Sequence, residues 1–377
     1  MIRRLAGFLI AGSFLVCMDL SAHHGASLYD TTTTITVSGR VTNFRFAFPH
    51  VLVYVAAEGE NGEIVEWSGE LTTPNRLTRG VGGGGTTNNI RWTDDTLLPG
   101  DEIELTGNPA RNTAPSMRIR RIVDASGMVL IGGEEGDGRS TVATRESRPT
   151  STERTGGGAD LSGVWMRRYE HRFENFSFTA ELPPMTTWGR ERFEATRPTF
   201  GSRGVAVAET NDPGYQCLPP GVPRIYAHPA PFEIVQTPDR VMIVYEYQHL
   251  IRHVFTDGRE HRQGRPASWM GESVGYWEGD VLVVETVNFN DKTWIDRRGL
   301  PHSEQLRVVE RFQRSDENEL TLDITVEDPI AFTEPWTARR VFDAVEWRLE
   351  ESVCLDNSSF GEFERTLLEY EGGSEQE

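Results

Sequence analysis

The stretch that decides the fold is residues 268–312, SWMGESVGYWEGDVLVVETVNFNDKTWIDRRGLPHSEQLRVVERF. Val281 to Val287 is an apolar, β-branched run, and the turn Glu278-Gly279-Asp280 separates it from a strand-like segment that ends at Trp277. Two such runs joined by a tight Gly-containing turn are typical of a β-hairpin. A polar and aromatic loop follows, and then another strand-like run, Leu306 to Phe312. The stretch predicts an antiparallel sheet with a decorated loop at one end.

The same pattern of short runs and turns continues on both sides of this stretch. Alternation in the segment Leu320 to Val326 gives one apolar face, as expected of a half-buried strand. We expect strands at Phe232–Gln236, Arg240–Tyr247, Ile251–Phe255, Val274–Trp277, Val281–Val287, Leu306–Arg314, Glu319–Glu327, Thr337–Phe342 and Trp347–Val353. About nine strands with short turns predict an antiparallel barrel over residues 160–356, with a helix at Pro184 to Thr196 before it. A β-sandwich with an added helix is the alternative.

The N-terminal half has a second set of short strand-like runs. We expect them at Ile35–Val41, Val51–Ala56, Ile64–Leu71, Asp101–Thr106 and Arg118–Val123, with a short helix at Pro74–Arg79. Five strands with a helix between the third and the fourth is the order of an OB-fold barrel, which we expect over residues 23–131. Residues 132–159 are polar and lack apolar periodicity, so they predict a flexible linker, and residues 357–377 form a C-terminal tail. The fold class is therefore all-β.

Composition restricts the partners. The chain has 377 residues and a net charge of -19, without a basic stripe interleaved with aromatic residues. Because nucleic-acid binding needs clustered Lys and Arg, a nucleic-acid partner is not expected. The length suggests at least two domains.

The first 22 residues predict the compartment. Arg3 and Arg4 precede an apolar segment, Leu5 to Val16, and Leu20-Ser21-Ala22 offers a small-residue cleavage site. This pattern is typical of a signal peptide, so we expect a periplasmic or secreted protein without a transmembrane segment after cleavage. The alternative is a lipoprotein attached through Cys17.

Two cysteines, Cys217 and Cys354, remain after such a cleavage. In an exported protein they most simply form one disulfide, which would stabilise the second domain by about 4 kcal/mol on the chain-entropy model. The alternative is two buried free thiols.

Several motifs resemble those of known protein groups. Gly163-Val164-Trp165 resembles the opening of the lipocalin and calycin barrels, in which the Trp closes one barrel end. The chain as a whole resembles a group of uncharacterised exported bacterial proteins with two domains, through the segments His23–Gly25, Pro49–Val51, Cys217–Arg224 and Trp269–Asp280. Gly25 replaces the Ser of that group. The resemblance implies an OB-fold-like domain followed by a lipocalin-like barrel, and it implies no activity.

The first candidate site is a metal site made by His23, His24 and His50. Cleavage after Ala22 would make His23 the mature N-terminus, whose amine and imidazole form a chelate that copper favours. The alternative is that these histidines are solvent-exposed, with His50 capping the turn before its strand.

The second candidate site is the C-terminal barrel. Tyr245, Tyr247 and His249 alternate, so they would share one face if the strand stays regular. A barrel interior with such side chains would bind a small, largely apolar ligand with one polar group. The ligand-binding set that we expect is Tyr245, Tyr247, His249, Trp269, Trp294 and Arg298.

The same barrel would instead house an enzyme if acid-base groups converge in it. The catalytic set would be Tyr245, His253, His302 and Asp296, because His titrates near neutrality and a carboxylate would orient it. The His-Glu-x-x-His motif of zinc proteases does not occur in the chain. Ligand binding in the barrel is the leading hypothesis, and catalysis there and copper binding at the N-terminus are its alternatives.

Overall fold

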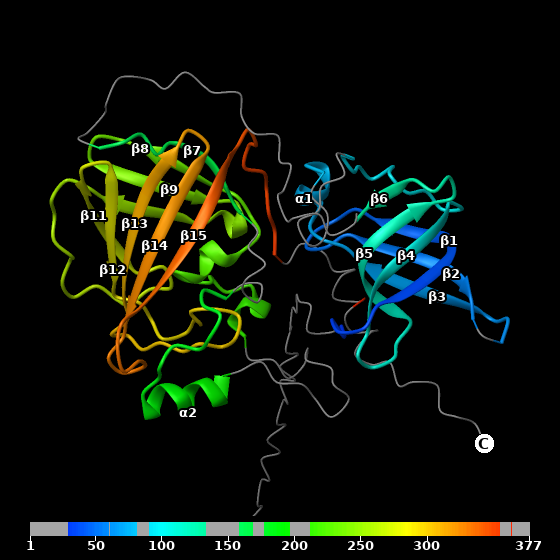
Figure 1. Cartoon of the computed structure of the whole chain (residues 1–377), viewed down its shortest axis with the longest axis horizontal. Helices are drawn as coiled ribbons and strands as arrows, with labels where there is room; N and C mark the ends of the chain where they lie inside the picture. Colours follow the sequence, from blue (N-terminus) through cyan, green and yellow to red (C-terminus); the bar gives the residue numbers. More distant parts are fainter. Residues whose placement is uncertain are drawn as a thin grey trace, which may run out of the picture.

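The chain forms two β-barrel domains that lie side by side (Figure 1). The computed structural model describes residues 29–59, 61–80, 90–132, 158–168, 177–196, 212–354 and 363. The signal peptide, the Cys17 alternative, nearly all of the linker and most of the tail lie outside the described residues. Among the described residues, no helix has the length and apolar character needed to cross a membrane.

The N-terminal domain is a small barrel with the OB-fold order. Its elements are β1 (Ile35–Arg45), β2 (Leu52–Glu58), β3 (Ile64–Glu70), α1 (Pro74–Thr78), β4 (Glu102–Pro109), β5 (Ser116–Asp124) and β6 (Val129–Ile131). The sheet runs β3-β2-β1-β4-β5, and a parallel pairing of Ser68 with Ser116 closes it. Alternating apolar residues such as Val53, Val55 and Leu105 face the barrel core. The predicted strand-and-helix order is confirmed, and the three-residue β6 was not predicted.

The C-terminal domain is a closed nine-stranded barrel. Its strands are β7 (Gly163–Arg167), β8 (Phe232–Gln236), β9 (Arg240–Tyr245), β10 (Ile251–Phe255), β11 (Glu272–Glu278), β12 (Val281–Val287), β13 (Arg307–Asp316), β14 (Glu319–Glu327) and β15 (Trp336–Val345). Neighbouring strands pair antiparallel except β10 and β11, which pair in parallel. The predicted hairpin in the stretch 268–312 is confirmed by the pairing of Glu278 with Val281. A helix, α2 (Thr187–Thr196), occurs within the range predicted for it.

Two expected strands differ from the structure. β9 ends at Tyr245, because a 3-10 turn, η6 (Tyr247–His249), follows it with left-handed backbone at Gln248. Residues 347–353 form no strand, and β7 contributes the ninth strand of the barrel instead. The backbone of residues 347–353 is engaged by side chains from both domains, as described below.

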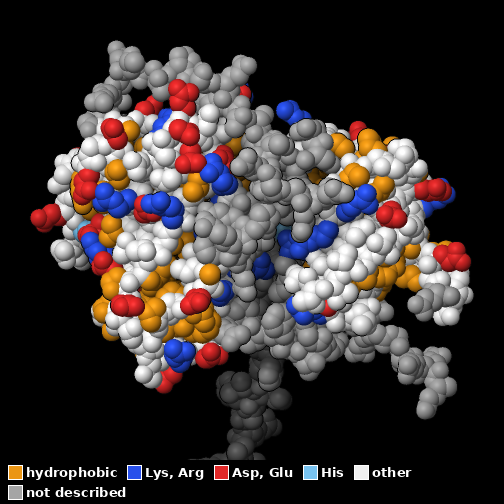
Figure 2. Space-filling model, viewed as in Figure 1, with side chains coloured by type: hydrophobic (Ala, Val, Ile, Leu, Met, Phe, Trp, Pro, Cys, Tyr) orange, Lys and Arg blue, Asp and Glu red, His pale blue; other side chains and the backbone are white. Residues whose placement is uncertain are grey.

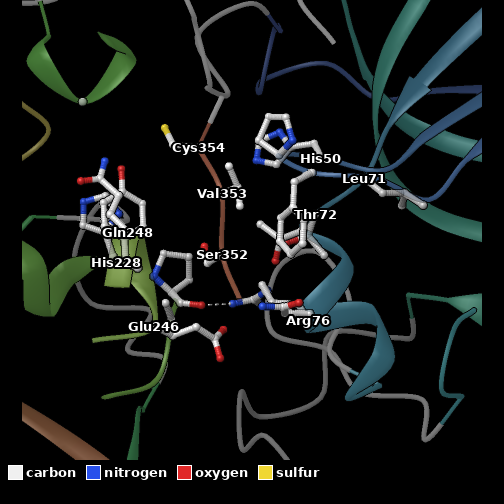
Figure 3. Close-up of a pocket in the computed structure, with 18 of the residues that line it drawn as sticks. His50, Leu71, Thr72, Arg76, His228, Glu246, Gln248, Ser352, Val353 and Cys354 are labelled. Carbon is white, nitrogen blue, oxygen red and sulfur yellow. Dashed lines mark hydrogen bonds between the residues drawn. The ribbon is translucent and has the colours of Figure 1, made fainter. Parts of the chain in front are cut away.

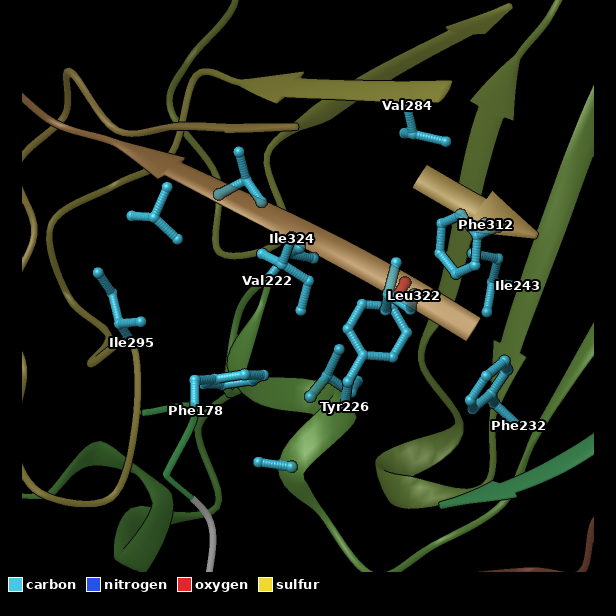
Figure 4. Close-up of a cluster of buried hydrophobic side chains, with 14 of the residues drawn as sticks. Phe178, Val222, Tyr226, Phe232, Ile243, Val284, Ile295, Phe312, Leu322 and Ile324 are labelled. Carbon is cyan, nitrogen blue, oxygen red and sulfur yellow. The ribbon is translucent and has the colours of Figure 1, made fainter. Parts of the chain in front are cut away.

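Side chains fill the middle of the C-terminal barrel. A short 3-10 helix, η5 (Arg224–Ala227), inserts Tyr226 between aromatic rings (Figure 4). The ring centroid of Tyr226 lies 5.7 Å from that of Phe232, 6.0 Å from that of Phe312 and 6.1 Å from that of Phe342, all in edge-to-face geometry. Each such pair contributes about 0.5–1.5 kcal/mol beyond the burial of its area. Trp165 is also completely buried in this core, and its indole Nε1 donates to the Leu161 carbonyl.

Candidate functional site

A cavity of about 200 Å³ lies between the two barrels, and both domains line it (Figure 3). We call it the interdomain pocket. Its walls come from the loop before β2, the loop after β3 with α1, the turns around η4 (Pro213–Gln216), η5 and η6, and the segment Ser352–Cys354. The lining residues used below are Phe48, His50, Leu71, Arg76, Arg118, Asp212, Arg224, His228, Ala230, Glu246, Tyr247, Gln248, Arg297 and Val353.

Contacts from α1 hold the two domains together beside this pocket. Arg79, directly after α1, donates two hydrogen bonds of 2.9 and 2.6 Å to the carboxylate of Glu246 in the C-terminal domain. Arg76 Nη1 donates to the Pro229 carbonyl at 3.0 Å, the contact drawn as a dashed line in Figure 3. Asn75 donates to the Glu351 carbonyl at 2.9 Å. These charged and neutral hydrogen bonds all come from α1 and the residue after it. They therefore fix the position of the N-terminal wall of the pocket relative to the C-terminal wall.

A buried carboxylate orients His50 on the N-terminal wall. Glu70, the last residue of β3, is only 3% exposed, accepts a 2.8 Å hydrogen bond from the Tyr29 hydroxyl and pairs with Nδ1 of His50. Burial alone would raise the pKa of Glu70, but His50, Arg118 and the Tyr29 hydroxyl together lower it below its ordinary value. Burial and the nearby Glu70 charge raise the pKa of Tyr29 well above its ordinary value. The wall therefore presents an ionised carboxylate with a fixed imidazole.

A second buried ion pair organises the C-terminal wall. Arg224 of η5 donates to both carboxylate oxygens of Asp212, at 2.8 and 2.7 Å, and both side chains are nearly completely buried. Asp212 also caps η4 by accepting from the Gly214 amide at 2.9 Å. The Arg224 guanidinium lies 5.7 Å from the centroid of the Trp294 ring. These contacts fix the orientation of Arg224 at the pocket.

A stacked pair of rings, His228 and Tyr247, completes this wall. Their centroids lie 4.1 Å apart, with 28° between the ring planes. Burial lowers the pKa of His228 well below its ordinary value, and the positive charges of Arg224, Arg167 and Arg297 lower it further. Burial raises the pKa of Tyr247 to about 12. Both rings are therefore neutral at pH 7 and offer an apolar face with polar edges.

The backbone around the pocket adopts conformations that cost free energy. Cys217, Gln248 and His249 have φ values of 56°, 56° and 51°, in the left-handed region that non-glycine residues rarely occupy. Hydrogen bonds hold these residues in place. Gln248 Nε2 donates to the Cys217 carbonyl at 2.9 Å, and His249 Nε2 accepts from the Ser352 amide at 2.9 Å. Such a conformation costs about 1–3 kcal/mol per residue and persists only where surrounding contacts enforce it. Residues of this kind cluster at functional sites.

The predicted disulfide between Cys217 and Cys354 is confirmed. It closes a chain segment with a sequence separation of 137 residues and joins η4 to the segment Ser352–Cys354, which lines the interdomain pocket. The disulfide therefore holds one wall of the pocket in place.

The residues predicted to act in the C-terminal barrel separate into different environments. Tyr245 points into the filled core, where its hydroxyl donates to the Tyr226 hydroxyl at 2.8 Å. Tyr247 instead lines the interdomain pocket, and His249 contacts the Ser352 amide. The expectation that these three side chains share one face is wrong, because β9 ends at Tyr245 and η6 turns the chain.

The remaining residues predicted for the barrel site also lie in different parts of the C-terminal domain. His253 lies on the exposed side of β10, with its ring stacked on Phe255. Asp296 is buried and bonded to Arg298, and burial raises the pKa of its carboxyl. Trp294 is buried beneath Arg224. Trp269 is half-buried, and its backbone carbonyl lies against Gly221. The four barrel residues predicted for catalysis therefore contact different partners and do not form one site.

The predicted metal ligands are only partly described. His23 and His24 lie outside the described residues, and His50 faces the interdomain pocket beside Glu70. Within the described ranges, no three His, Cys, Asp or Glu side chains gather in a way that would hold a metal ion. Copper binding at the mature N-terminus stays a prediction.

His302 is a buried histidine that we expect to make stability pH-dependent. Its Nε2 lies 2.6 Å from Thr293 Oγ1 and its Nδ1 lies 3.1 Å from the Ser303 carbonyl, an arrangement that suits a neutral ring with the proton on Nδ1. Burial lowers its pKa below 6.5, the ordinary value. A histidine with a depressed folded pKa contributes stability above its unfolded pKa, and this contribution is lost as the pH falls through the folded pKa.

The unfolding free energy of wild type should therefore fall between pH 7 and pH 5 by about 1 kcal/mol more than that of His302→Gln. Urea unfolding at the two pH values measures this difference. His253→Gln, on the exposed side of β10, is the matched control and should keep the wild-type pH dependence. Equal pH dependence of wild type and His302→Gln would contradict the prediction.

Several residues of the interdomain pocket were not predicted from the sequence as functional. Arg118, His228 and Arg297 line it, and Glu70 pairs with the lining residue His50; these four come from separate elements that only the folded chain brings together. Arg224 ends the segment Cys217–Arg224 that resembles other exported proteins, so a signal for it existed in that motif.

A comparison with known proteins gives a match for the N-terminal part of the chain. Residues 14–117 are similar to a family of unknown function (DUF6152). No curated protein matches the sequence. The similarity covers most of the OB-fold-like barrel, including His50 and Glu70, and it names no activity.

Proposed function

We propose that the protein is an exported small-molecule-binding protein whose ligand site is the interdomain pocket. The observation that carries the proposal is a cavity between two barrels that combines apolar walls with a few oriented polar side chains, such as His50 and Arg224. Ligand sites are typically of this kind and occur preferentially between domains. The disulfide supports an oxidising compartment outside the cytosol.

The location of the site differs from the barrel interior expected from the sequence. Tyr226, Phe312 and their aromatic neighbours pack in the middle of the C-terminal barrel, and Arg252 and Glu310 form a buried ion pair there. Ligand binding therefore fits the junction better than the barrel.

Filling the pocket should abolish ligand retention. Val353 lines the pocket and is part of the segment fixed by the disulfide, so Val353→Trp would place an indole in the cavity. We expect native mass spectrometry of untagged protein from the exporting host to show a retained small molecule in wild type and not in Val353→Trp. Met128→Trp, at a 52% exposed residue between β5 and β6, is the control and should retain the molecule.

Two results would contradict this proposal. One is an equal amount of retained molecule in wild type and Val353→Trp, which would place the ligand elsewhere. The other is the absence of any retained or added small molecule from wild type across a metabolite screen, with the disulfide intact.

The His50–Glu70 pair favours an enzyme as the second candidate. A carboxylate that fixes an imidazole at a pocket wall is the arrangement of a general base. The same mass spectra distinguish the two functions. If the protein is an enzyme, the molecule recovered from wild type should be chemically altered, whereas the molecule recovered from His50→Gln should be the unaltered substrate. Recovery of an unaltered molecule from wild type would leave binding as the function.

A further inference from the structure

A second cavity, of about 280 Å³, opens between β10 and β11 of the C-terminal barrel, and we call it the β10–β11 cleft. Residues of β10, of the loop between the two strands and of the start of β11 line it. The cleft shares none of its described lining residues with the interdomain pocket, and β11 lies on the side of the barrel away from the N-terminal domain (Figure 1). Residues 270–273 of the cleft belong to the segment Trp269–Asp280, to which the proposed function gives no role.

The pairing of β10 with β11 is short. Val254 pairs with Ser273 and Phe255 pairs with Val274, in parallel. Among the described strands, the residues of β10 before this pairing have β9 as their only neighbour. The barrel is therefore closed by two residue pairs at this seam, and the start of β10 keeps a free edge.

Ile251 directs its backbone hydrogen-bonding groups toward the cleft. The Tyr245 amide of β9 donates to the Leu250 carbonyl at 2.8 Å, so Leu250 belongs to a hydrogen-bonded pair of these two strands. Bonded and non-bonded pairs alternate along an antiparallel ladder, so the N–H and C=O of the next residue, Ile251, point away from β9. Within the described ranges, neither of these two groups has a hydrogen-bond partner.

The chain before β11 is turned away from this edge and held there. Gly271 has a φ of 67°, in the left-handed region that favours glycine. The Ser268 amide donates to the Asn288 carbonyl at 3.0 Å, and the Asn290 amide donates to the Ser268 carbonyl at 2.9 Å. The Asn288 side chain donates to the Pro266 carbonyl at 3.0 Å. The segment before β11 therefore follows the end of β12, and the edge of β10 stays open to another chain.

The side chains beside the free edge are largely apolar. Ile251 is 56% exposed, and Phe255, Pro266 and Met270 also line the cleft. A free strand edge binds an extended peptide as an added strand, with affinity from main-chain hydrogen bonds and specificity from the pockets for alternate side chains. The cleft combines both features.

The charge at the cleft favours an acidic peptide. Three arginines line it, of which Arg252 pairs with Glu310 and Arg262 pairs with Glu272. Arg265 is exposed and has no ion pair or hydrogen bond with any described residue. Figure 2 shows acidic and basic side chains interspersed over the visible face of the C-terminal barrel. An acidic side chain on a bound peptide would supply the counter-charge that Arg265 lacks.

We propose that the β10–β11 cleft binds an extended segment of another protein, which adds to the free edge at Ile251 as a strand and places an acidic side chain at Arg265. The inference is independent of the proposed function, because it uses other residues and another surface.

An array of pentapeptides measures the selection. The peptides are N-acetylated, attached through their C-termini and incubated with the labelled mature, disulfide-bonded chain. We expect the bound peptides to be enriched in Asp or Glu and in β-branched residues, and depleted in Pro, which cannot donate to a strand. In solution, methylation of the backbone nitrogens of the strongest binder should weaken its affinity by about fivefold or more, because it removes the strand donors.

Variants at Ile251 locate the strand edge. Ile251→Pro removes the donor that faces the cleft, and the preceding Leu250 has a φ of -69° and a ψ of 138°, a conformation that suits the residue before a proline. Ile251→Val keeps the donor and is the matched control. Fluorescence anisotropy with the strongest binder should give Ile251→Pro an affinity about fivefold or more below that of Ile251→Val. If Ile251→Pro does not fold, the methylated peptide tests the same hydrogen bonds.

Variants at Arg265 test the charge. Arg265→Gln should weaken binding of the acidic peptide by about fivefold or more, and leave binding of its Asn or Gln analogue unchanged. Arg265→Lys should keep part of the affinity, because it retains the charge without the guanidinium fork. Circular dichroism spectra and thermal unfolding confirm that each variant is folded.

An array on which wild type binds no peptide would overturn the inference, as would equal affinities of Ile251→Pro and Ile251→Val or of the methylated and unmethylated peptides. An acidic peptide that binds Arg265→Gln as tightly as wild type would also overturn it. A dimer in analytical ultracentrifugation that Ile251→Pro dissociates would assign the edge to a second copy of the chain instead. Val353→Trp should bind the peptide like wild type, so failure at the cleft leaves the proposed function untouched.

Discussion

Replacing Glu310 with alanine is expected to lower the free energy of unfolding by about 3–5 kcal/mol, the largest loss that we expect from any single substitution. Glu310 is completely buried in the C-terminal barrel and pairs with the guanidinium of Arg252, which is 2% exposed. Arg252 also donates to the Ser273 hydroxyl at 2.9 Å, the Tyr226 hydroxyl at 2.8 Å and the Thr286 hydroxyl at 2.6 Å. Removing the carboxylate would leave a buried cation without its counter-charge.

Chemical denaturation of wild type and variant measures this loss. Asp323→Ala is the matched control, because it breaks an Arg–carboxylate pair with Arg339 between two exposed side chains and should cost less than about 1 kcal/mol. The double variant Arg252→Met, Glu310→Leu should recover much of the loss, since no buried charge remains. A Glu310→Ala variant as stable as Asp323→Ala would show that the pair is not buried as described.

Removing the disulfide is expected to cost about 2–5 kcal/mol, because the bond restrains a long loop in the unfolded chain. The sequence separation of Cys217 and Cys354 is 137 residues. The double variant Cys217→Ser, Cys354→Ser should also retain less ligand, because the bond fixes the segment Ser352–Cys354 at the pocket. Thermal unfolding and native mass spectrometry measure the two effects.

Reduced wild-type protein is the control for this variant and should show the same loss of stability. The Ser352 amide would still donate to His249 Nε2, so the segment should stay near the pocket with weakened restraint. Unchanged stability in both the variant and the reduced protein would contradict the role given to the disulfide.

Most of the architecture followed from local patterns in the sequence. Strict alternation, as in Leu320 to Val326, marks one buried and one exposed strand face, and tight Gly-containing turns mark the hairpins. The OB-fold order was predictable because short strands and one Pro-initiated helix are separated by clear turns. The disulfide was predictable because the predicted cleavage leaves only two cysteines.

The errors arose where tertiary contacts override local preference. Residues 347–353 have strand-like composition, but the Glu350 amide donates to Glu246 and the Glu351 carbonyl accepts from Asn75, so this backbone bonds to side chains rather than to a strand. Left-handed backbone at Gln248 ends the pattern that begins in β9. Neither the hydrogen bonds of residues 347–353 nor the left-handed backbone at Gln248 has a signature in the local sequence.

The candidate site was the least predictable feature. His50 was singled out as a metal ligand, but its partner Glu70 lies 20 residues away in the sequence and carries no motif. Arg118 and Arg297 line the same pocket only because α1 and its neighbours join the two barrels. Sequence patterns identify the buried faces of one domain, whereas this pocket depends on how two domains pack.

A crystal structure of the protein purified with its retained molecule tests the central claim most directly. We predict difference electron density for a small molecule in the interdomain pocket, in contact with Leu71 and Val353. Density for that molecule inside the C-terminal barrel, in place of the packing around Tyr226, would contradict the account.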